Sequence, residues 1–412
     1  MKIAVEAHAL SQEKITGVGN VILHYLNELQ RIDTKNEYFI YTMEDLKHLN
    51  IGAPRWHHVE FSYPVKRLLV KTRRRWLHLK DETKRHPGVM LSVETMLFRI
   101  AKIMLEIPDE IIFTYKLASS LKKNRVDIYI GTSTYYYPYF FLSPVRKVGI
   151  LYDLVWKLYP GTMEFGNRVR MTLFTLRNMK KIDLLISISE NTAKDARDIL
   201  RLKTRIEAIP LAADPEIFYL AGASSVAAAK KRYGIGKKYI LTVCTLEPRK
   251  NLKALLAAYQ KMPSRRNYQL VLVGMAGWSN AEFFREIETS DVGDNVIFTG
   301  YIPSAELAPI YSGAEIFVFP TFYEGFGLPV LEAMQCGCPV ITSNTSSIPE
   351  VAGDAAIMVD PNDTNALAAG METLLNSPTT RKNLSTRGIR RAALFSWETS
   401  ARMLLASLNS LK

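Results

Sequence analysis

The chain has 412 residues, 48% of them hydrophobic, and its formal net charge at pH 7 is +13. This length and composition allow a large buried core and, at roughly 100 to 200 residues per domain, favour two globular domains. Because no run of about 18 uninterrupted apolar residues occurs, no membrane-spanning helix is expected. The N-terminal sequence MKIAVEAHAL predicts a first strand and not a signal sequence, so we expect a cytoplasmic protein.

The three cysteines of the chain are too few for a disulfide framework. Cys336 and Cys338 would supply only two of the four ligands that a structural zinc site needs. We therefore interpret Cys244 and this pair as small core residues in a reducing compartment.

Through the first half of the chain, short apolar runs alternate with segments of helical periodicity, which is the pattern of a parallel sheet covered by helices. The predicted strands span residues 2–7, 38–42, 57–61, 126–132, 148–153, 183–189 and 205–211. A helix is predicted at 17–32, where one apolar stripe contains Val21, Leu23, Tyr25, Leu26 and Leu29. Residues of about 64–124 are more irregular and more helical, and indicate an insertion into the first domain.

The predicted insertion begins with a strongly basic segment, Pro64 to Arg85. Nine Lys and Arg residues occur there with only two acidic residues, which gives a segment charge of +7. Leu68, Trp76 and other apolar residues lie among the cations, so two interpretations stand side by side: a solvated helix face, or a segment that lies on an anionic membrane surface. A nucleic-acid contact ranks behind both, because no aromatic and basic nucleic-acid module accompanies the segment.

A second alternating series follows residues 214–229, a junction whose latter part is rich in Ala and Ser. Its predicted strands span 239–246, 268–274, 295–300, 315–321 and 339–343, and a helix is predicted at 251–262. The sequence thus predicts an α/β protein with two doubly wound, Rossmann-like domains that face each other across a cleft. In such sheets the ligand binds beyond the carboxyl ends of the strands, so the loops that follow strands are expected to carry the site.

Two loops of the first domain carry candidate site residues. Gly17 and Gly19 open the first helix and would let backbone N–H groups approach a phosphate or a sugar, although turn geometry alone explains such a pair equally well. A dinucleotide fingerprint would need a third glycine where Ile22 stands, which argues against a nicotinamide-dependent dehydrogenase. After the strand at 148–153, Asp153 either faces the cleft as an acid or closes a local Asx turn.

The second domain adds charged residues at strand ends. Arg249 and Lys250 lie just before a helix whose N-terminus favours anions, so we prefer a diphosphate clamp to a surface charge pair. In the loop after the strand at 315–321, glycines free backbone N–H groups to face a phosphate, with Glu324 before them and Glu332 after them. A carboxylate accepts hydrogen bonds from vicinal hydroxyls, so we expect one acid to hold a transferred sugar and the other a ribose.

The run EGFGLPVLEAMQCGCPVI, in which Glu324 and Glu332 are separated by seven residues, resembles the signature of the family-4 retaining glycosyltransferases of the GT-B fold. The similarity extends to EPRKN, FTGYIPSAELAPIYSGAEIFVFPT, SSIPEVAGDAA and FSWETSARMLL, and covers most of the chain outside about 64–124. It implies an acceptor-side domain at 1–213, a nucleotide-sugar donor domain at 214–395, and a terminal helix at 396–412 that packs back on the first domain.

The resemblance also implies roles for the matching residues. Arg249 and Lys250 would bind the donor diphosphate, and Tyr301 would lie near the base. Glu324 would bind the donor sugar and Glu332 the ribose. The backbone that would contact the phosphate and the sugar belongs to Gly325, Phe326, Gly327 and Leu328.

The acceptor side departs from the family at one position. Many members have a His-Asp pair where this chain has Tyr152 and Asp153, so the role of that histidine is not carried over. Asp153 is expected to orient or deprotonate the acceptor, while the leaving phosphate takes the acceptor's proton on the same face and the anomeric configuration is retained. No Asp-x-Asp sequence occurs, so neither a metal nor a cofactor beyond the nucleotide sugar is expected.

The expected function is transfer of a hexose, with mannose from GDP-mannose preferred, to a lipid-linked or oligosaccharide acceptor. The chain resembles the mannosyltransferase and rhamnosyltransferase branch of bacterial surface polysaccharide synthesis, which implies a place on the cytoplasmic face of the inner membrane. A UDP-hexose or dTDP-rhamnose donor is one alternative, and a non-catalytic sugar-nucleotide-binding scaffold is another. A glycoside hydrolase also uses two carboxylates, but it would leave Arg249 and Lys250 without a role.

Overall fold

A computed structural model describes residues 1–13, 15, 17–61, 114–132, 145–162, 171, 175–275 and 281–412. The basic segment Pro64 to Arg85 lies outside these residues, so its expected contact with an anionic membrane stays a prediction. Most of the expected insertion lies outside them as well, and its last part, residues 114–123, is helical. Within the described part of the chain, none of the helices combines the length and the apolar character needed to cross a lipid bilayer.

The first half of the chain forms a parallel sheet in the order β3-β2-β1-β4-β5-β6-β7. Its strands are β1 (Lys2–Glu6), β2 (Glu37–Thr42), β3 (Trp56–Glu60), β4 (Ile128–Gly131), β5 (Arg146–Leu151), β6 (Leu184–Ser187) and β7 (Arg205–Ala208). Besides the helical residues 114–123, the described part of this half contains the helices α1 (Gly17–Ile32), α4 (Val155–Leu158), α6 (Leu176–Met179) and α7 (Glu190–Asp198), with the 3-10 helices η1 (His8–Ser11) and η3 (Pro160–Thr162).

The second half forms a separate parallel sheet in the order β10-β9-β8-β11-β12-β13. Its strands are β8 (Lys238–Val243), β9 (Tyr268–Val273), β10 (Val296–Gly300), β11 (Ile316–Phe319), β12 (Val340–Ser343) and β13 (Ala356–Val359). In both sheets the order reverses beside the first strand of the series, as in doubly wound folds. The predicted fold class, two Rossmann-like domains of GT-B type, is therefore confirmed.

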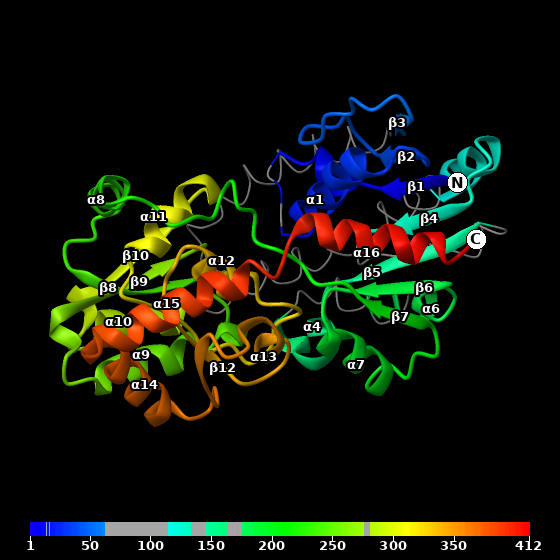
Figure 1. Ribbon diagram of the computed structural model, residues 1–412. Coiled ribbons are helices and arrows are strands. Elements are labelled where there is room, and N and C mark those ends of the chain that lie inside the picture. The colour runs from blue at the N-terminus through cyan, green and yellow to red at the C-terminus, as the bar shows by residue number, and fades with distance from the viewer. Residues whose placement is uncertain are drawn as a thin grey trace, which may run out of the picture.

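Helices cover the second sheet on both faces (Figure 1). They are α8 (Ala223–Arg232), α9 (Leu252–Lys261), α10 (Ala281–Glu288), α11 (Leu307–Ser312), α12 (Leu328–Gln335), α13 (Ile348–Ala352), α14 (Thr364–Asn376) and α15 (Pro378–Ala392). The 3-10 helices are η5 (Pro248–Lys250), η6 (Arg265–Asn267), η7 (Gly293–Asn295) and η8 (Ser304–Glu306). The last helix, α16 (Trp397–Asn409), follows α15 after a short connection.

The cores follow from the apolar runs that predicted the strands. All four residues of β11 are fully buried, as expected of a central parallel strand covered on both faces. Helix α1 has the predicted bounds, but Ile22 is buried in its apolar face and Leu23 is only half-buried. Cys244, Cys336 and Cys338 are buried free thiols, as the sequence indicated.

Helix α16 leaves the second sheet and returns to the first (Figure 1). It packs against α1, with Leu404 and Leu408 buried and Trp397 stacked on His24 at 4.6 Å between ring centroids. The chain therefore passes between the two halves twice, once before α8 and once between α15 and α16. Both termini lie on the N-terminal half as a result.

Candidate active site

The loop between β11 and α12, residues 320–327, carries Glu324 at the carboxyl end of the second sheet. Gly327 ends the loop with a φ of 114°, a conformation that side-chain-bearing residues rarely adopt, and α12 begins at the next residue. The loop after β12 holds its backbone: the Glu324 N–H donates to Ser346 Oγ at 3.0 Å, and Ser347 Oγ donates to the carbonyls of Glu324 and Phe326 at 2.9 and 2.7 Å. The position of Glu324 is thus fixed by main-chain contacts on both sides.

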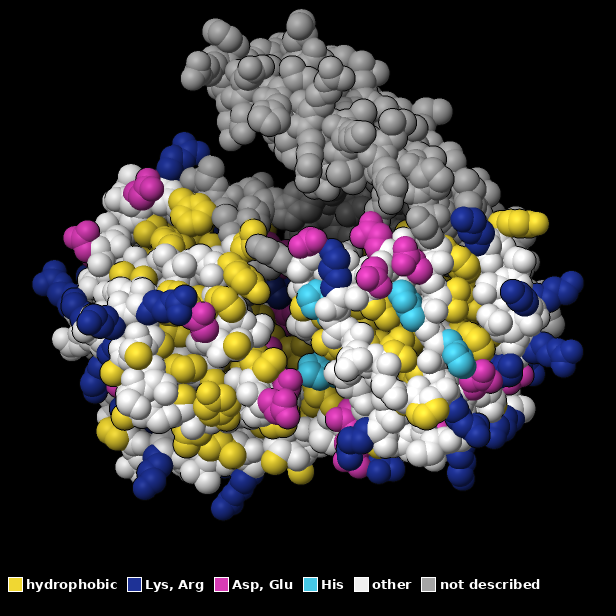
Figure 2. Space-filling view, turned by 90° about the horizontal axis from the view of Figure 1, so that it is seen from above, with side chains coloured by type: hydrophobic (Ala, Val, Ile, Leu, Met, Phe, Trp, Pro, Cys, Tyr) yellow, Lys and Arg dark blue, Asp and Glu magenta, His cyan; other side chains and the backbone are white. Residues whose placement is uncertain are grey.

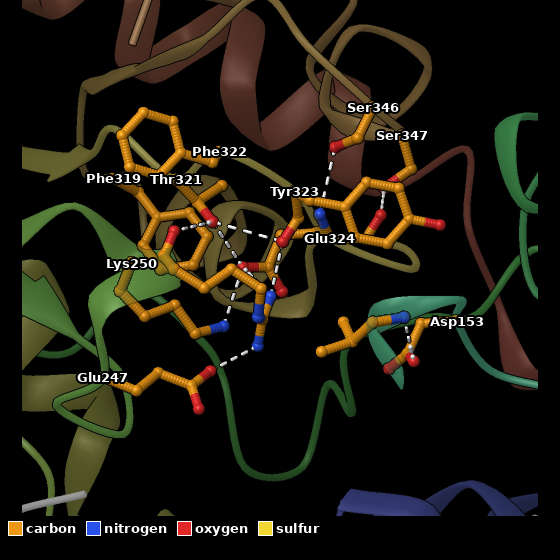
Figure 3. A network of polar contacts seen from close by, with 12 residues as sticks. Asp153, Glu247, Lys250, Phe319, Thr321, Phe322, Tyr323, Glu324, Ser346 and Ser347 are labelled. Atoms are coloured by element: carbon orange, nitrogen blue, oxygen red, sulfur yellow. Dashed lines mark hydrogen bonds and ion pairs between the residues drawn. The ribbon is translucent and has the colours of Figure 1, made fainter. Parts of the chain in front are cut away.

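Three donors converge on one oxygen of the Glu324 carboxylate (Figure 3). Lys250 Nζ lies 2.7 Å from Oε1, Arg249 Nη1 lies 2.9 Å away, and Thr321 Oγ1 lies 2.8 Å away. Lys250 and Glu324 are each only 8% exposed. Burial raises the pKa of Glu324, but the charges of Lys250 and Arg249 outweigh burial, so the net shift of this pKa is downward. Glu324 is therefore a buried carboxylate that stays ionised.

Arg249 links this carboxylate to the surrounding backbone. Its Nη1 also donates to the Tyr323 carbonyl, and its Nη2 donates to the Glu247 carboxylate. Burial disfavours the charged form of Arg249, while Glu324 and Glu247 raise its pKa and keep it charged. Its buried Nε–H has no hydrogen-bond partner among the described residues. A buried donor of this kind is suited to an anionic ligand oxygen.

Asn251 fixes the two basic residues in the loop after β8. Its φ of 58° is left-handed, and its Nδ2 donates to the carbonyls of Pro320 and Pro361 at 3.1 and 2.7 Å. The segment that carries Arg249 and Lys250 is thereby tied to the loop that carries Glu324. Asparagine suits this position because its short amide tolerates the left-handed region.

Asp153 approaches the same loop from the first sheet (Figure 3). It accepts a hydrogen bond from the Val155 N–H at 3.0 Å, so the Asx turn considered from the sequence is present. It also lies beside Gly325, where a Cβ atom added to the glycine would lie 3.0 Å from the Asp153 Cβ and 1.9 Å from the Tyr152 carbonyl oxygen. Burial raises the pKa of Asp153. The Asx turn is therefore observed, while the role of Asp153 as a cleft acid stays a prediction.

Glu332 lies in α12, away from the cluster around Glu324. It accepts a hydrogen bond from the Tyr311 hydroxyl at 2.9 Å, and α11 supplies that tyrosine. Burial raises the pKa of Glu332 to about 7, although the Tyr311 hydrogen bond lowers it. This carboxylate therefore changes charge near neutral pH.

The other predicted residues lie at several places around the strand ends. Gly17 is exposed at the first position of α1, and Gly19 is buried, with Ile15 Cγ1 only 2.7 Å from where a Cβ would lie. Tyr301 follows β10 and is 59% exposed. Phe326 is buried and packs edge-on against Phe395, and Leu328 is the first residue of α12.

Sequence reasoning missed several residues that build this site. Glu247 and Asn251 belong to the quoted EPRKN motif, so the motif itself held the signal. Thr321, Ser346 and Ser347 also lie within quoted motifs, but a motif does not show that they contact Glu324 or its backbone, because these contacts join separate loops. Among the described residues, no three His, Cys, Asp or Glu side chains gather in a way that would hold a metal ion.

The second half of the chain matches a known protein family. Residues 226–391 match the family described as glycosyl transferases group 1, and this stretch contains Arg249, Lys250, Glu324 and Glu332. The second half carries a glycosyl transferases group 1 domain. This match confirms the resemblance to glycosyltransferases for residues 226–391.

Two proteins similar to this chain are mannosyltransferases of Escherichia coli. O-antigen chain mannosyltransferase B is 44% identical over 162 residues, which are 39% of this chain and 42% of that protein. The serotype-specific mannosyltransferase WbdA is 30% identical over 278 residues, which are 65% of this chain and 34% of that protein. The matches thus span less than half of the length of these relatives.

A solved structure supports the fold over the whole chain. Sucrose-phosphate synthase from Thermosynechococcus elongatus superimposes with a TM-score of 0.72 and 20% identity, covering 100% of this chain and 98% of that one. At this identity the likeness concerns the GT-B fold alone.

Proposed function

We propose that the protein transfers mannose from GDP-mannose to a lipid-linked or oligosaccharide acceptor in surface polysaccharide synthesis, with retention of the anomeric configuration. The observation that carries the proposal is the buried cluster of Lys250, Arg249 and Glu324 at the strand ends of a glycosyl transferases group 1 domain. The mannosyltransferase relatives support mannose as the sugar. That the nucleotide is GDP and that the anomeric configuration is retained are both proposed.

Lys250 and Arg249 stabilise the departing GDP in this proposal. Cleavage of the sugar–phosphate bond places negative charge on the leaving diphosphate, and preorganised cations in a buried site stabilise that charge by about 3 kcal/mol per well-placed donor. The Arg249 Nε–H and the backbone N–H groups of Gly325 to Leu328, at the N-terminus of α12, are further donors for phosphate oxygens. These protein groups supply the positive charge, so the proposed reaction needs no metal ion.

Glu324 holds the transferred sugar. Its Oε1 is occupied by Lys250, Arg249 and Thr321, and none of the described residues donates a hydrogen bond to its Oε2. Ionised Oε2 can accept hydrogen bonds from sugar hydroxyls. Glu332 accepts hydrogen bonds from the ribose hydroxyls in the same way. The two acids therefore bind the two sugar rings on either side of the diphosphate.

Asp153 orients the acceptor hydroxyl or takes its proton. It lies beside Gly325 and therefore close to the sugar position that Glu324 defines. A carboxyl group whose pKa is raised by burial takes up a proton more readily than an exposed one. Where Asp153 only orients the hydroxyl, the leaving phosphate oxygen takes its proton. In both cases the acceptor oxygen bonds to the anomeric carbon on the face from which the phosphate departs, which accounts for the proposed retention.

A thermal-shift titration with GDP, UDP, dTDP and ADP tests the donor. A ligand that binds only the folded state stabilises it by about 2.7 kcal/mol at a hundredfold excess over its dissociation constant. A shift with GDP alone is the expected result. A shift with UDP or dTDP instead would reject GDP-mannose and keep a nucleotide-sugar enzyme.

Turnover separates an enzyme from a non-catalytic scaffold. We expect the protein to release GDP from GDP-mannose in the presence of a mannose-containing oligosaccharide acceptor, with an α-linked product by NMR. An inverted β-linked product would contradict retention. Binding of GDP without release from GDP-mannose with any acceptor would favour the scaffold.

A further inference from the structure

Helix α7 lies in the first half of the molecule, yet it contacts the loop of the second half that carries Glu324. Thr192 Oγ1 donates to the Gly325 carbonyl at 3.1 Å, and the Tyr323 hydroxyl donates to Asp195 Oδ2 at 2.9 Å. Thr192 is fully buried in this contact. The residues on both sides of Glu324 in the chain are therefore held from the opposite half of the molecule.

Glu350, which lies in α13, adds a further contact between the second half of the molecule and α7. Its Oε2 accepts from the Glu190 N–H at 2.9 Å, and its Oε1 accepts from the Asn191 N–H at 3.2 Å. The first amides of a helix have no partner within the helix, and the helix dipole favours an anion there. Glu350 thus caps α7 from α13, which lies beside α7 and α4 at the boundary between the halves (Figure 1).

These contacts lie next to the reactive groups without touching them. The Tyr323 carbonyl accepts from Arg249, and Ser347 holds the Glu324 and Phe326 carbonyls. A shift of the Tyr323–Gly325 backbone therefore moves the Glu324 carboxylate relative to the two cations. A misplacement of about 1 Å can cost about a hundredfold in rate.

We infer that Thr192, Asp195 and Glu350 are positioning residues that set the Glu324 loop for reaction when the two halves are together. The inference rests on the proposed function, and it adds that Glu324 depends on the first half for its geometry. A donor can bind to the second half alone, but the sugar reaches its reactive position only when α7 holds the loop.

The variant Thr192→Val tests this directly, because valine keeps the buried volume and removes only the hydroxyl. We expect kcat for GDP release from GDP-mannose to fall about tenfold or more, with KM for GDP-mannose within about twofold of wild type. Thr192→Ser restores the hydroxyl and should recover most of kcat. Asp198→Ala, an exposed position on the same helix, is the matched control and should leave kcat unchanged.

A double-mutant cycle tests the hydrogen bond between Tyr323 and Asp195. Tyr323→Phe and Asp195→Ala each remove the hydrogen bond between α7 and the loop, although Asp195 also accepts from Asn191 Nδ2 within the helix. If the bond positions Glu324, the double variant should lose no more kcat than the more affected single variant. Fully additive losses would overturn the contribution of this contact.

Hydrogen exchange keeps the inference separable from the proposed function. If the wild-type protein releases no GDP from GDP-mannose, the proposed function fails, and exchange at residues 322–326 decides the inference. Faster exchange of these amides in Thr192→Val, at an unchanged Tm, would support it, and unchanged exchange would overturn it. In an active enzyme, an unchanged kcat in Thr192→Val, or an equal loss in Thr192→Ser, would overturn it.

Discussion

Lys250 and Glu324 neutralise each other inside the second half of the molecule, and this mutual dependence governs how the site responds to substitution. Removing one partner of a buried ion pair leaves the other charge uncompensated and costs about 3–5 kcal/mol. For this reason an alanine at either position is expected to affect stability as well as function. Substitutions that keep the shape of the side chain separate the two effects.

Lys250→Ala should weaken GDP binding about tenfold or more, because it removes a cation that would contact the diphosphate. It should also lower the thermal unfolding temperature, since Glu324 loses its 2.7 Å partner. Lys261→Ala, an exposed lysine on α9, is the control. Titration of GDP by calorimetry measures the affinity, and an unchanged affinity in Lys250→Ala would contradict the clamp.

The raised pKa of Glu332 leads us to expect that nucleotide binding depends on pH. Burial raises its pKa to about 7, and ribose hydroxyls donate to its ionised form. At pH 6 most of this group is protonated and must lose the proton to bind, so GDP affinity should rise about tenfold from pH 6 to pH 8. Part of any rise comes from the phosphate itself, which also titrates near pH 6. Glu332→Gln isolates that part, and an equal pH dependence in this variant would refute the assignment.

At the residue scale, the sequence predicted that Arg249, Lys250 and Glu324 belong to one site, and the structure brings their side chains together. It did not predict that Lys250 and Arg249 both bond directly to Glu324. Motif spacing locates residues at strand ends, but it carries no information on which oxygen a side chain contacts. Ser346 belongs to a quoted motif, but it lies in a neighbouring loop, so the motif does not show that it contacts the Glu324 backbone.

Between neighbouring elements, the close approach of the Glu324 loop to the end of β5 restricts which residues the loop can hold. Gly325→Ala would place a Cβ atom 1.9 Å from the Tyr152 carbonyl oxygen, so the loop must move away from Asp153. We expect transfer to be lost. GDP binding should weaken by less, because Arg249, Lys250 and Glu332 keep their places although the loop amides move. Gly222→Ala, where no atom lies within 4 Å of the added Cβ, is the control. Normal transfer by Gly325→Ala would contradict this account of the loop.

Most strands were predictable because parallel strands buried on both faces appear as continuous apolar runs. Helix α1 was predicted with its observed bounds because its opening glycines and its 3.6-residue stripe agree. Strand β13 was not predicted: it is four residues long, three of them are only half-buried, and it lies at the edge of the second sheet.

At the scale of the whole molecule, two chain crossings and the contacts of α7 and α16 join the halves. Seen from above, Lys and Arg side chains are most frequent along the outer edges of this face, and some of the acidic and His side chains lie toward its middle (Figure 2). The contacts across the boundary could not be predicted. Thr192 and the Gly325 carbonyl are 133 positions apart, and such a pair leaves no local pattern in the sequence.

Replacing Trp397 measures how much the packing of α16 contributes to the stability of the protein. It is 6% exposed and packs against His24 and Tyr25 of α1. Trp397→Ala should destabilise the protein by about 3–5 kcal/mol, because it leaves a cavity under α16. Denaturant unfolding measures the loss, with Leu394→Ala, at an exposed position before α16, as a control that should change stability by less than about 0.5 kcal/mol. Equal stability of the two variants would show that α16 contributes little to the packing.

The central claim is that Glu324 holds the sugar that is transferred, and Glu324→Gln tests it most directly. Glutamine keeps the shape of the side chain and removes its charge. Thermal unfolding of the variant then checks that the fold is intact. The measurement is transfer from GDP-mannose together with GDP affinity in the same preparation. We predict that transfer falls at least a hundredfold while GDP still binds. Transfer at the wild-type rate by a folded Glu324→Gln protein would contradict the account.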